Sequence, residues 1–216
     1  SGSPPDRNPM IISHHRKFVF TAIPKTGTHS VRQALREHLG PDDEEQVRLF
    51  FEKRLPYPEL ARLGHGHISL QEARPVLGEE TFERYFKFAF VRNPFDRFVS
   101  YCAFATSREG SFERDPQGVM RHFLFVAPPH HHIVFRPQHS FVTGPDGALL
   151  ADYLGRVEDM QNGYDAICAR IGIPSRSLER ANTSKHADYR SYYDQQLIDG
   201  VARMFARDIE LFGYQF

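Results

Sequence analysis

A short apolar run that leads into a tight loop and then an amphipathic helix occurs twice in this chain, and it limits the possible folds most strongly. Residues 18–23 (FVFTAI) form the first run, and after a PKTGT turn, apolar side chains recur at helical spacing over 29–39. Residues 86–91 (FKFAFV) form the second run, followed by a helix expected over 94–105, where Pro94 suits the first helical position. Buried strands that each feed a helix are typical of a parallel sheet covered by helices.

The rest of the chain extends this pattern. Residues 148–156 have the character of another strand that leads into a helix over 158–171, and apolar spacing marks a long C-terminal helix over 197–212. We therefore predict an α/β fold with three layers, a mainly parallel central sheet and a P-loop-like strand–loop–helix unit. The chain is expected to be a single domain, 1–216, in which 1–15 is a flexible N-terminal extension.

Charge and composition exclude several classes of partner. The 27 basic and 27 acidic side chains cancel, so no global field draws the chain onto nucleic acid, an anionic membrane or a polyanion, and any anion needs a local site. No apolar window has the length of a membrane span and no signal region is visible, so we expect a soluble, cytoplasmic protein without stable membrane insertion. Cys102 and Cys168 are expected to be buried free thiols, with one disulfide as the alternative.

The loop over 24–30 (PKTGTHS) has the composition of a phosphate site. It leaves a strand and opens a helix, so backbone N–H groups and the positive helix end converge there, and Gly27 lets the backbone come close to a ligand. It is not a Walker A loop, because Lys25 precedes the glycine, and the second strand ends in Arg92 rather than a Mg²⁺-binding aspartate. An ordinary turn is the alternative. The side chains suited to phosphate are Lys25, Thr26, Thr28 and Ser30.

Arg92 marks a second anion site. It follows the second strand, at the carboxyl edge where parallel sheets bind ligands, and its guanidinium can donate two parallel hydrogen bonds to a phosphate. Ser100, on the next helix, can add a hydroxyl. An ion pair of Arg92 with Asp96 or Glu113 is the alternative. The two sites together predict a ligand phosphorylated at two separate places.

At this point the motifs resemble those of a known family. IPKTGTHS (23–30) resembles the 5′-phosphosulfate loop of sulfotransferases, and FVRNPFDRFVS (90–100) resembles their motif for the 3′-phosphate of 3′-phosphoadenosine 5′-phosphosulfate (PAPS). PKTGT, LGRVEDM (154–160) and NTSKHADYRSYYD (182–194) are similar to segments of the carbohydrate branch, which includes heparan sulfate 2-O-sulfotransferases and chondroitin or dermatan sulfotransferases. A soluble bacterial-type member of this branch is expected.

The resemblance implies how the donor is bound. PAPS is the implied donor and adenosine 3′,5′-bisphosphate the product, with no metal ion required, and Lys25 is implied to stabilise charge on the leaving phosphate. A polar loop at 183–185 is implied to close over the donor, with a solvated loop as the alternative. The implied donor-binding residues are Pro24, Lys25, Thr26, Gly27, Thr28, His29, Ser30, Arg92, Ser100, Thr183, Ser184 and Lys185.

The resemblance also suggests a catalytic base. GHGHIS (64–69) resembles the H-G-H segment of the uronyl 2-O-sulfotransferases, in which a histidine is the base, and histidine titrates in the range suited to that role. We favour His67 as the base, with His65 orienting or contacting the acceptor. A simple turn is the alternative role for both histidines. A carboxylate base, Glu72 or Glu158, ranks second.

The acceptor is the least constrained part of the prediction. The segments 40–65 and 106–145 are expected to select it, and within the second, His132 and Gln138 align with a segment of related enzymes and are expected to contact it. The run His130 to His132 lacks the ligand spacing of a metal site.

We predict sulfuryl transfer to a hydroxyl of a carbohydrate, less charged or smaller than heparan sulfate because the chain is neutral. A lipid, small alcohol or tyrosine acceptor is the first alternative, and a P-loop phosphotransferase or a non-catalytic binding protein is a more distant one. The sequence leaves the oligomeric state open.

Overall fold

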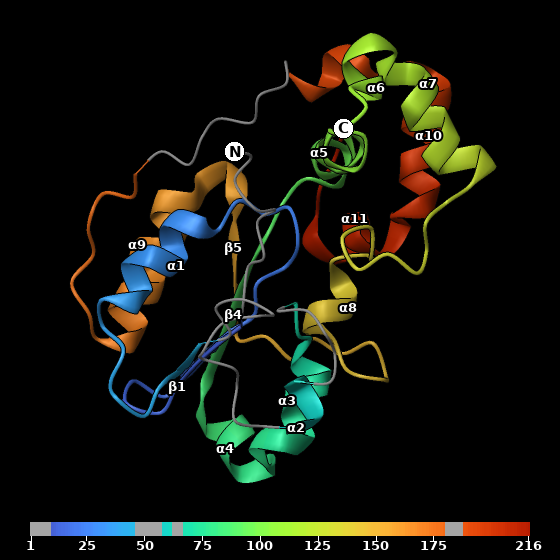
Figure 1. Cartoon of the computed structure of the whole chain (residues 1–216). Coiled ribbons are helices and arrows are strands. Elements are labelled where there is room, and N and C mark those ends of the chain that lie inside the picture. The colour runs from blue at the N-terminus through green and yellow to red at the C-terminus, as the bar shows by residue number, and fades with distance from the viewer. Residues whose placement is uncertain (1–9, 46–57, 62–66, 180–187) are drawn as a thin grey trace. The chain divides into compact units, whose positions relative to one another are not determined.

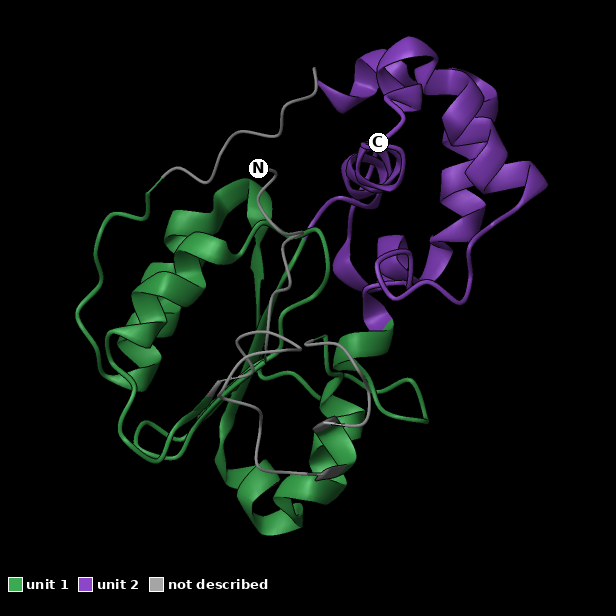
Figure 2. Ribbon diagram, in the orientation of Figure 1, with its two compact units in different colours: residues 1–91, 140–181 green, residues 92–139, 182–216 purple. Residues whose placement is uncertain are grey.

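Two parts of the chain each form their own apolar core, and Figure 2 colours these two units separately. Unit 1 comprises Ser1–Val91 and Ser140–Ala181, and unit 2 comprises Arg92–His139 and Asn182–Phe216. The single domain over 1–216 stays a prediction. The structure is a computed structural model that describes residues 10–45, 58–61, 67–179 and 188–216.

Unit 1 is built on a mixed, mainly parallel sheet. Its described strands have the order β3-β1-β2-β4-β5, in which β2 pairs parallel with β4 and β4 with β5. β1 pairs antiparallel with both β2 and β3, so it alone runs against the other strands. The predicted α/β fold with a mainly parallel sheet is confirmed. The strands are β1 (Ile11–Ser13), β2 (Phe18–Phe20), β3 (Glu44–Glu45), β4 (Phe86–Val91) and β5 (Tyr153–Arg156).

Helices cover both faces of this sheet. Helices α1 (His29–Arg36) and α9 (Met160–Ile171) lie on one side of the sheet (Figure 1). Their buried residues belong to the same core cluster as the strand residues Phe20 and Phe88. Strand residues of the opposite parity, such as Val19, are also fully buried, as expected when both faces are covered. Figure 1 shows α3 and α4 on the other side of the sheet. The remaining elements here are α2 (Pro58–Ala61), α3 (Leu70–Leu77), α4 (Glu79–Arg84), the 3-10 turn η2 (Val157–Asp159) and α8 (His139–Val142), which begins in unit 2.

Unit 2 is helical with an aromatic core. Phe98, Phe135 and Phe205 meet there, with ring centroids 5.5 Å apart for Phe135 and Phe205 and 6.3 Å apart for Phe98 and Phe205. Aromatic pairs at such distances add to the stabilisation from buried area. Its elements are α5 (Pro94–Ala105), α6 (Ser111–Arg114), α7 (Pro116–Arg121), the π-helix η1 (His122–Val126), the 3-10 helix η3 (Tyr189–Tyr192), α10 (Gln195–Met204) and α11 (Ala206–Phe212).

The second strand–loop–helix unit has the predicted boundaries. β4 covers 86–91 and α5 covers 94–105. The side chain of Asn93 accepts a hydrogen bond from the backbone N–H of Phe95 (3.0 Å), and Pro94 occupies the first helical position. The helix expected over 158–171 ends where predicted, because Gly172 closes α9 with φ +75°.

The strand predictions need two corrections. β2 ends at Phe20 rather than at 23, and β5 covers only 153–156 of the strand expected over 148–156. The expected flexible extension over 1–15 includes β1, because residues 10–12 are fully buried and 11–13 pair with β2, while 1–9 lie outside the described residues. An apolar run of only three residues is too short to distinguish a strand by its periodicity.

The C-terminal helix expected over 197–212 is two helices. α10 ends at Met204 and α11 begins at Ala206, with Phe205 (φ −115°, ψ 31°) outside helical geometry between them. The ring of Phe205 is 4% exposed and packs against Phe98 and Phe135. Burial of this ring in the aromatic core accompanies the break, and the helical spacing of the sequence continues through it.

Candidate functional site

The loop between β2 and α1 has an unusual backbone. Lys25 and Gly27 both have left-handed φ angles, +63° and +61°, on either side of Thr26, whose hydroxyl donates to the carbonyl of Ile23 (2.7 Å). A left-handed lysine is strained, and such strain gathers at ligand-binding loops. Alternation of left-handed residues turns successive backbone N–H groups toward one point, which is the geometry of an anion-binding nest.

Thr28 ends this loop as the N-cap residue of α1, but its side chain does not cap the helix. Its side chain is only 1% exposed, and its hydroxyl oxygen has no hydrogen-bond partner among the described residues. A buried hydroxyl without a partner costs about 1–3 kcal/mol. Its place at a helix N-terminus, where backbone N–H groups are unpaired, points to an anionic ligand that accepts both kinds of hydrogen bond.

The other side chains of this loop differ in exposure. Lys25 is half-buried, whereas Pro24 is buried and Gly27 and His29 are exposed. Ser30 is buried, and its hydroxyl lies 3.9 Å from the sulfur of Met160 at the start of α9.

His67 lies beside the segment that enters the loop. It is 4% exposed, and its Nδ1 is 3.0 Å from the carbonyl oxygen of Ala22, two residues before Pro24. A carbonyl only accepts hydrogen bonds, so Nδ1 carries the proton in this contact, and Nε2 of the neutral ring holds a lone pair. The hydrogen bond thus selects the tautomer that a general base requires at Nε2.

The carboxylate alternatives have other surroundings. Ser69 caps α3 through a capping box, in which its hydroxyl accepts from the backbone N–H of Glu72 (3.1 Å) and the carboxylate of Glu72 accepts from the backbone N–H of Ser69 (3.0 Å). These two bonds give Glu72 a structural role at the N-terminus of α3. Glu158 is exposed in the 3-10 turn before α9.

In unit 2, Arg92 lies directly after the last residue of β4 and is 8% exposed. Its Nε donates to the carboxylate of Asp96 (2.9 Å), which is the ion pair held open as an alternative. This bond uses the Nε–H at one edge of the guanidinium and orients the group. Ser100 is also buried, at 8% exposure, on α5.

The two expected acceptor residues have unlike environments. His132 is exposed, its ring contacts Tyr101 at 6.0 Å between centroids, and burial of part of the ring is the main cause that lowers its pKa. Gln138 is fully buried, and its side-chain amide bonds the backbone of Arg92. These hydrogen bonds of Gln138 therefore go to the main chain, and its expected contact with the acceptor stays a prediction.

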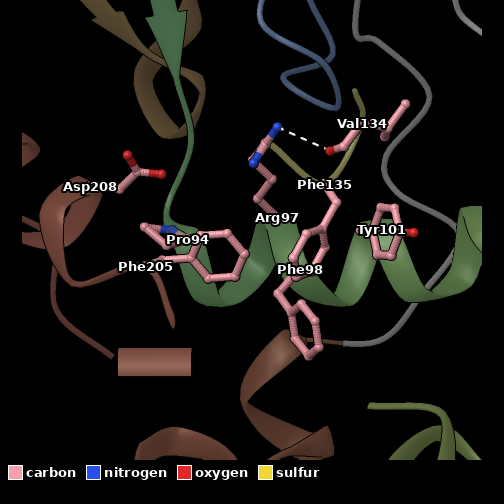
Figure 3. A pocket seen from close by; sticks show the side chains of 8 residues that line it. All are labelled: Pro94, Arg97, Phe98, Tyr101, Val134, Phe135, Phe205 and Asp208. Carbon is pink, nitrogen blue, oxygen red and sulfur yellow. Dashed lines mark hydrogen bonds between the residues drawn. The ribbon is translucent and has the colours of Figure 1, made fainter. Parts of the chain in front are cut away.

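Two ionisable side chains, Asp208 and Arg97, are buried in unit 2. Asp208, fully buried on α11, has its pKa raised by burial, while Arg97 on α5 has its pKa lowered by burial to about 10. Both line an enclosed cavity of about 10 Å³, in which Arg97 donates to the carbonyl of Val134 (3.2 Å) (Figure 3). A space of this size holds at most one water molecule, so it is not a donor or acceptor site.

Several predicted residues lie outside the described part of the chain: His65, Thr183, Ser184 and Lys185. Among the described residues, no group of three or more His, Cys, Asp or Glu side chains is arranged to hold a metal ion. Within the same residues, no helix has the length and apolar character to cross a membrane. Cys102 and Cys168 are both free and buried.

The sequence analysis missed Asp208 as a structural residue of this region. A signal was present, because Asp208 stands four residues after Met204 and four before Phe212, and so occupies the apolar stripe of the C-terminal segment. A carboxylate on such a stripe is buried only with hydrogen-bond partners.

One comparison with known proteins gives a match. Residues 8–106, just under half of the chain, match the model described as the sulfotransferase family. This range contains the loop over 24–30, His67, Arg92 and Ser100. The match supports a sulfotransferase family and sulfuryl transfer in general. No match was found among curated proteins or among solved structures.

Proposed function

We propose that the chain transfers a sulfuryl group from PAPS to a hydroxyl of a carbohydrate. The observation that carries the proposal is the loop after β2, where left-handed Lys25 and Gly27 lead to the buried, unpartnered hydroxyl of Thr28 at the N-terminus of α1. This loop falls within the range matched by the sulfotransferase family model. The unpartnered hydroxyl is the feature that a bound phosphosulfate satisfies.

Donor binding is divided between the two predicted anion sites. Residues 24–30 hold the 5′-phosphosulfate, while Arg92 and Ser100 hold the 3′-phosphate. β2 and β4 are neighbouring parallel strands of unit 1, so their carboxyl ends lie at the same edge of the sheet, and in the sequence the loop and Arg92 come after these ends. The resemblance adds Thr183, Ser184 and Lys185 to the donor site.

The chemistry assigns one task to each reacting side chain. PAPS supplies the sulfuryl group and a phosphate as leaving group. The Lys25 ammonium stabilises the charge that grows on that phosphate. Nε2 of His67 takes the acceptor's hydroxyl proton as the new oxygen–sulfur bond forms and the bond between sulfur and the phosphate oxygen breaks. Nδ1 of His67 stays bonded to Ala22 and keeps the ring oriented.

A surface groove of about 490 Å³ lies in unit 2, within the segment expected to select the acceptor, and it is the proposed contribution of this unit to acceptor binding. The groove offers an aromatic ring, hydroxyls and charged groups, and it borders the π-helix η1, an element frequent at functional sites. Side chains of this mixed kind suit a molecule rich in hydroxyls. The lining residues are Thr106, Ser111, Arg114, Asp115, Gly118, Val119, His122 and Phe123.

Calorimetry with two nucleotides tests the donor assignment. We expect adenosine 3′,5′-bisphosphate to bind more tightly than ATP with Mg²⁺, and Thr28→Val to weaken that binding by about tenfold because a hydrogen bond to a charged group is lost. Thr81→Val on α4 is the matched control and is expected to have no effect. Tighter binding of ATP with Mg²⁺ would contradict the proposal and favour a phosphotransferase.

A further inference from the structure

Gln138 forms a cyclic pair of hydrogen bonds with the main chain of Arg92. The backbone N–H of Arg92 donates to Oε1 of Gln138 (2.9 Å), and Nε2 of Gln138 donates to the carbonyl of Arg92 (2.8 Å). The side-chain amide of Gln138 therefore bonds the N–H and the C=O of Arg92, as the backbone of a neighbouring strand would. Arg92 is the first residue after β4, which ends at Val91. This amide satisfies both buried main-chain groups of Arg92.

Asp208 holds Gln138 in turn. Its two carboxylate oxygens accept from the backbone N–H groups of Gln138 and His139, each at 2.8 Å. Asp208 and Gln138 are both fully buried, so water does not compete for these bonds. A chain of four charge-assisted or amide hydrogen bonds therefore connects α11 to the main chain of Arg92.

These contacts restrict both the main chain and the side chain of Arg92. Its main chain is fixed by Gln138 and its guanidinium by Asp96, so both ends of the side chain are oriented in unit 2. Fixing a long side chain before the ligand arrives removes part of the entropic cost of binding. A fixed orientation favours phosphate binding, because the hydrogen bonds between a guanidinium and a phosphate require a specific geometry.

We propose that Gln138, held in place by Asp208, is a positioning residue that orients Arg92 for the 3′-phosphate of the donor. This inference rests on the proposed function, in which Arg92 binds that phosphate. It replaces the expected contact of Gln138 with the acceptor, because the side chain is enclosed and its amide is bonded to Arg92.

The test compares two nucleotides that differ only in the 3′-phosphate. Adenosine 3′,5′-bisphosphate and adenosine 5′-monophosphate are titrated into the wild type, Gln138→Leu and Gln117→Leu. We expect Gln138→Leu to reduce the ratio of the two affinities at least tenfold by weakening the bisphosphate alone. Gln117 also bonds a backbone carbonyl in unit 2, that of Tyr192 (3.0 Å), so Gln117→Leu is the matched control and keeps the wild-type ratio.

A double variant separates positioning from general loss of structure. In Arg92→Ala, the further change Gln138→Leu is expected to cost no additional bisphosphate affinity, because its effect passes through the missing guanidinium. Additive losses would overturn the proposal. If Gln138→Leu does not fold, Gln138→Glu takes its place in both experiments, since it keeps the acceptor for the Arg92 N–H and loses the donor. Its expected loss in the affinity ratio is at least threefold.

The outcomes for the two proposals are distinct. A wild type that binds the bisphosphate and the monophosphate equally refutes the donor assignment itself. A wild type that prefers the bisphosphate, together with a glutamine variant that keeps the full preference, leaves the donor assignment standing and refutes the positioning role.

Discussion

Replacement of Lys25 by glycine is expected to make the protein more stable and inactive. Lys25 has φ +63°, and a left-handed conformation costs a residue other than glycine about 1–2 kcal/mol. Glycine removes this cost but adds about 0.4–1 kcal/mol of entropy to the unfolded chain. The net gain is about 1 kcal/mol, which corresponds to about 2–4 °C in Tm for a chain of this length.

Two further variants isolate the backbone contribution. Lys25→Ala loses the same ammonium but keeps the strained φ, so we expect it to be about 1 kcal/mol less stable than Lys25→Gly. Gly27→Ala introduces the strain at φ +61°, where an added Cβ meets no atom within 4 Å, and is expected to lose about 1 kcal/mol through the backbone alone.

Scanning calorimetry gives the order of Tm values, and transfer of label from PAPS gives the activity. Lys25→Gly and Lys25→Ala are both expected to lose transfer, because each lacks the ammonium proposed to stabilise the leaving phosphate. A lower Tm for Lys25→Gly than for Lys25→Ala would refute the claim that the backbone of Lys25 is strained. Transfer near the wild-type rate at saturating PAPS in either variant would refute the role of the lysine.

Three other perturbations test separate parts of the account. Arg92→Ala is expected to weaken adenosine 3′,5′-bisphosphate by about 10- to 150-fold through loss of charged hydrogen bonds, and an unchanged affinity in calorimetry contradicts the 3′-phosphate site. His67→Ala is expected to lower kcat by about 10²–10⁴ with donor affinity retained, and a larger loss in His65→Ala would exchange the roles of the two histidines. Burial raises the pKa of Asp43, but hydrogen bonds from Ser13 and three backbone N–H groups together lower it by more, so that the pKa lies below its ordinary value of 3.8. Because the folded pKa is depressed, the ionised Asp43 carboxylate stabilises the fold at neutral pH, and this stabilisation disappears as pH falls below about 4. The loss of unfolding free energy in Asp43→Asn, measured by urea unfolding, should therefore shrink from pH 7 to pH 3. A loss that is the same at both pH values refutes the role of Asp43.

Local sequence determined the parts of the fold that local chemistry controls. The limits of β4 and α5 followed from an unbroken apolar run and from Pro94, because the first helical turn depends only on neighbouring residues. The motif over 24–30 is local in the same sense, since strand, glycine, hydroxyls and lysine are adjacent in the chain, and its role as a phosphate site stays a prediction.

Features that depend on distant residues were not predictable in this way. The break at Phe205 coincides with the packing of its ring on Phe98 and Phe135, about 70 to 107 positions earlier in the sequence, and the local spacing continues through it. The pairing of Gln138 with Arg92 joins residues 46 positions apart. A glutamine gives no sign in the sequence of the backbone that it will bond, and the expected acceptor contact of Gln138 rested on the likeness of its segment to related enzymes.

Sulfuryl transfer itself is the most direct test of the account. Wild type and Lys25→Ala are incubated with PAPS labelled in its sulfuryl group and a panel of neutral glycans, sulfated glycans, lipids and tyrosine peptides, and labelled product is measured. We predict transfer to a glycan hydroxyl by the wild type, with none by Lys25→Ala and no need for Mg²⁺. A wild type that binds adenosine 3′,5′-bisphosphate but labels no acceptor in the panel would contradict the central claim.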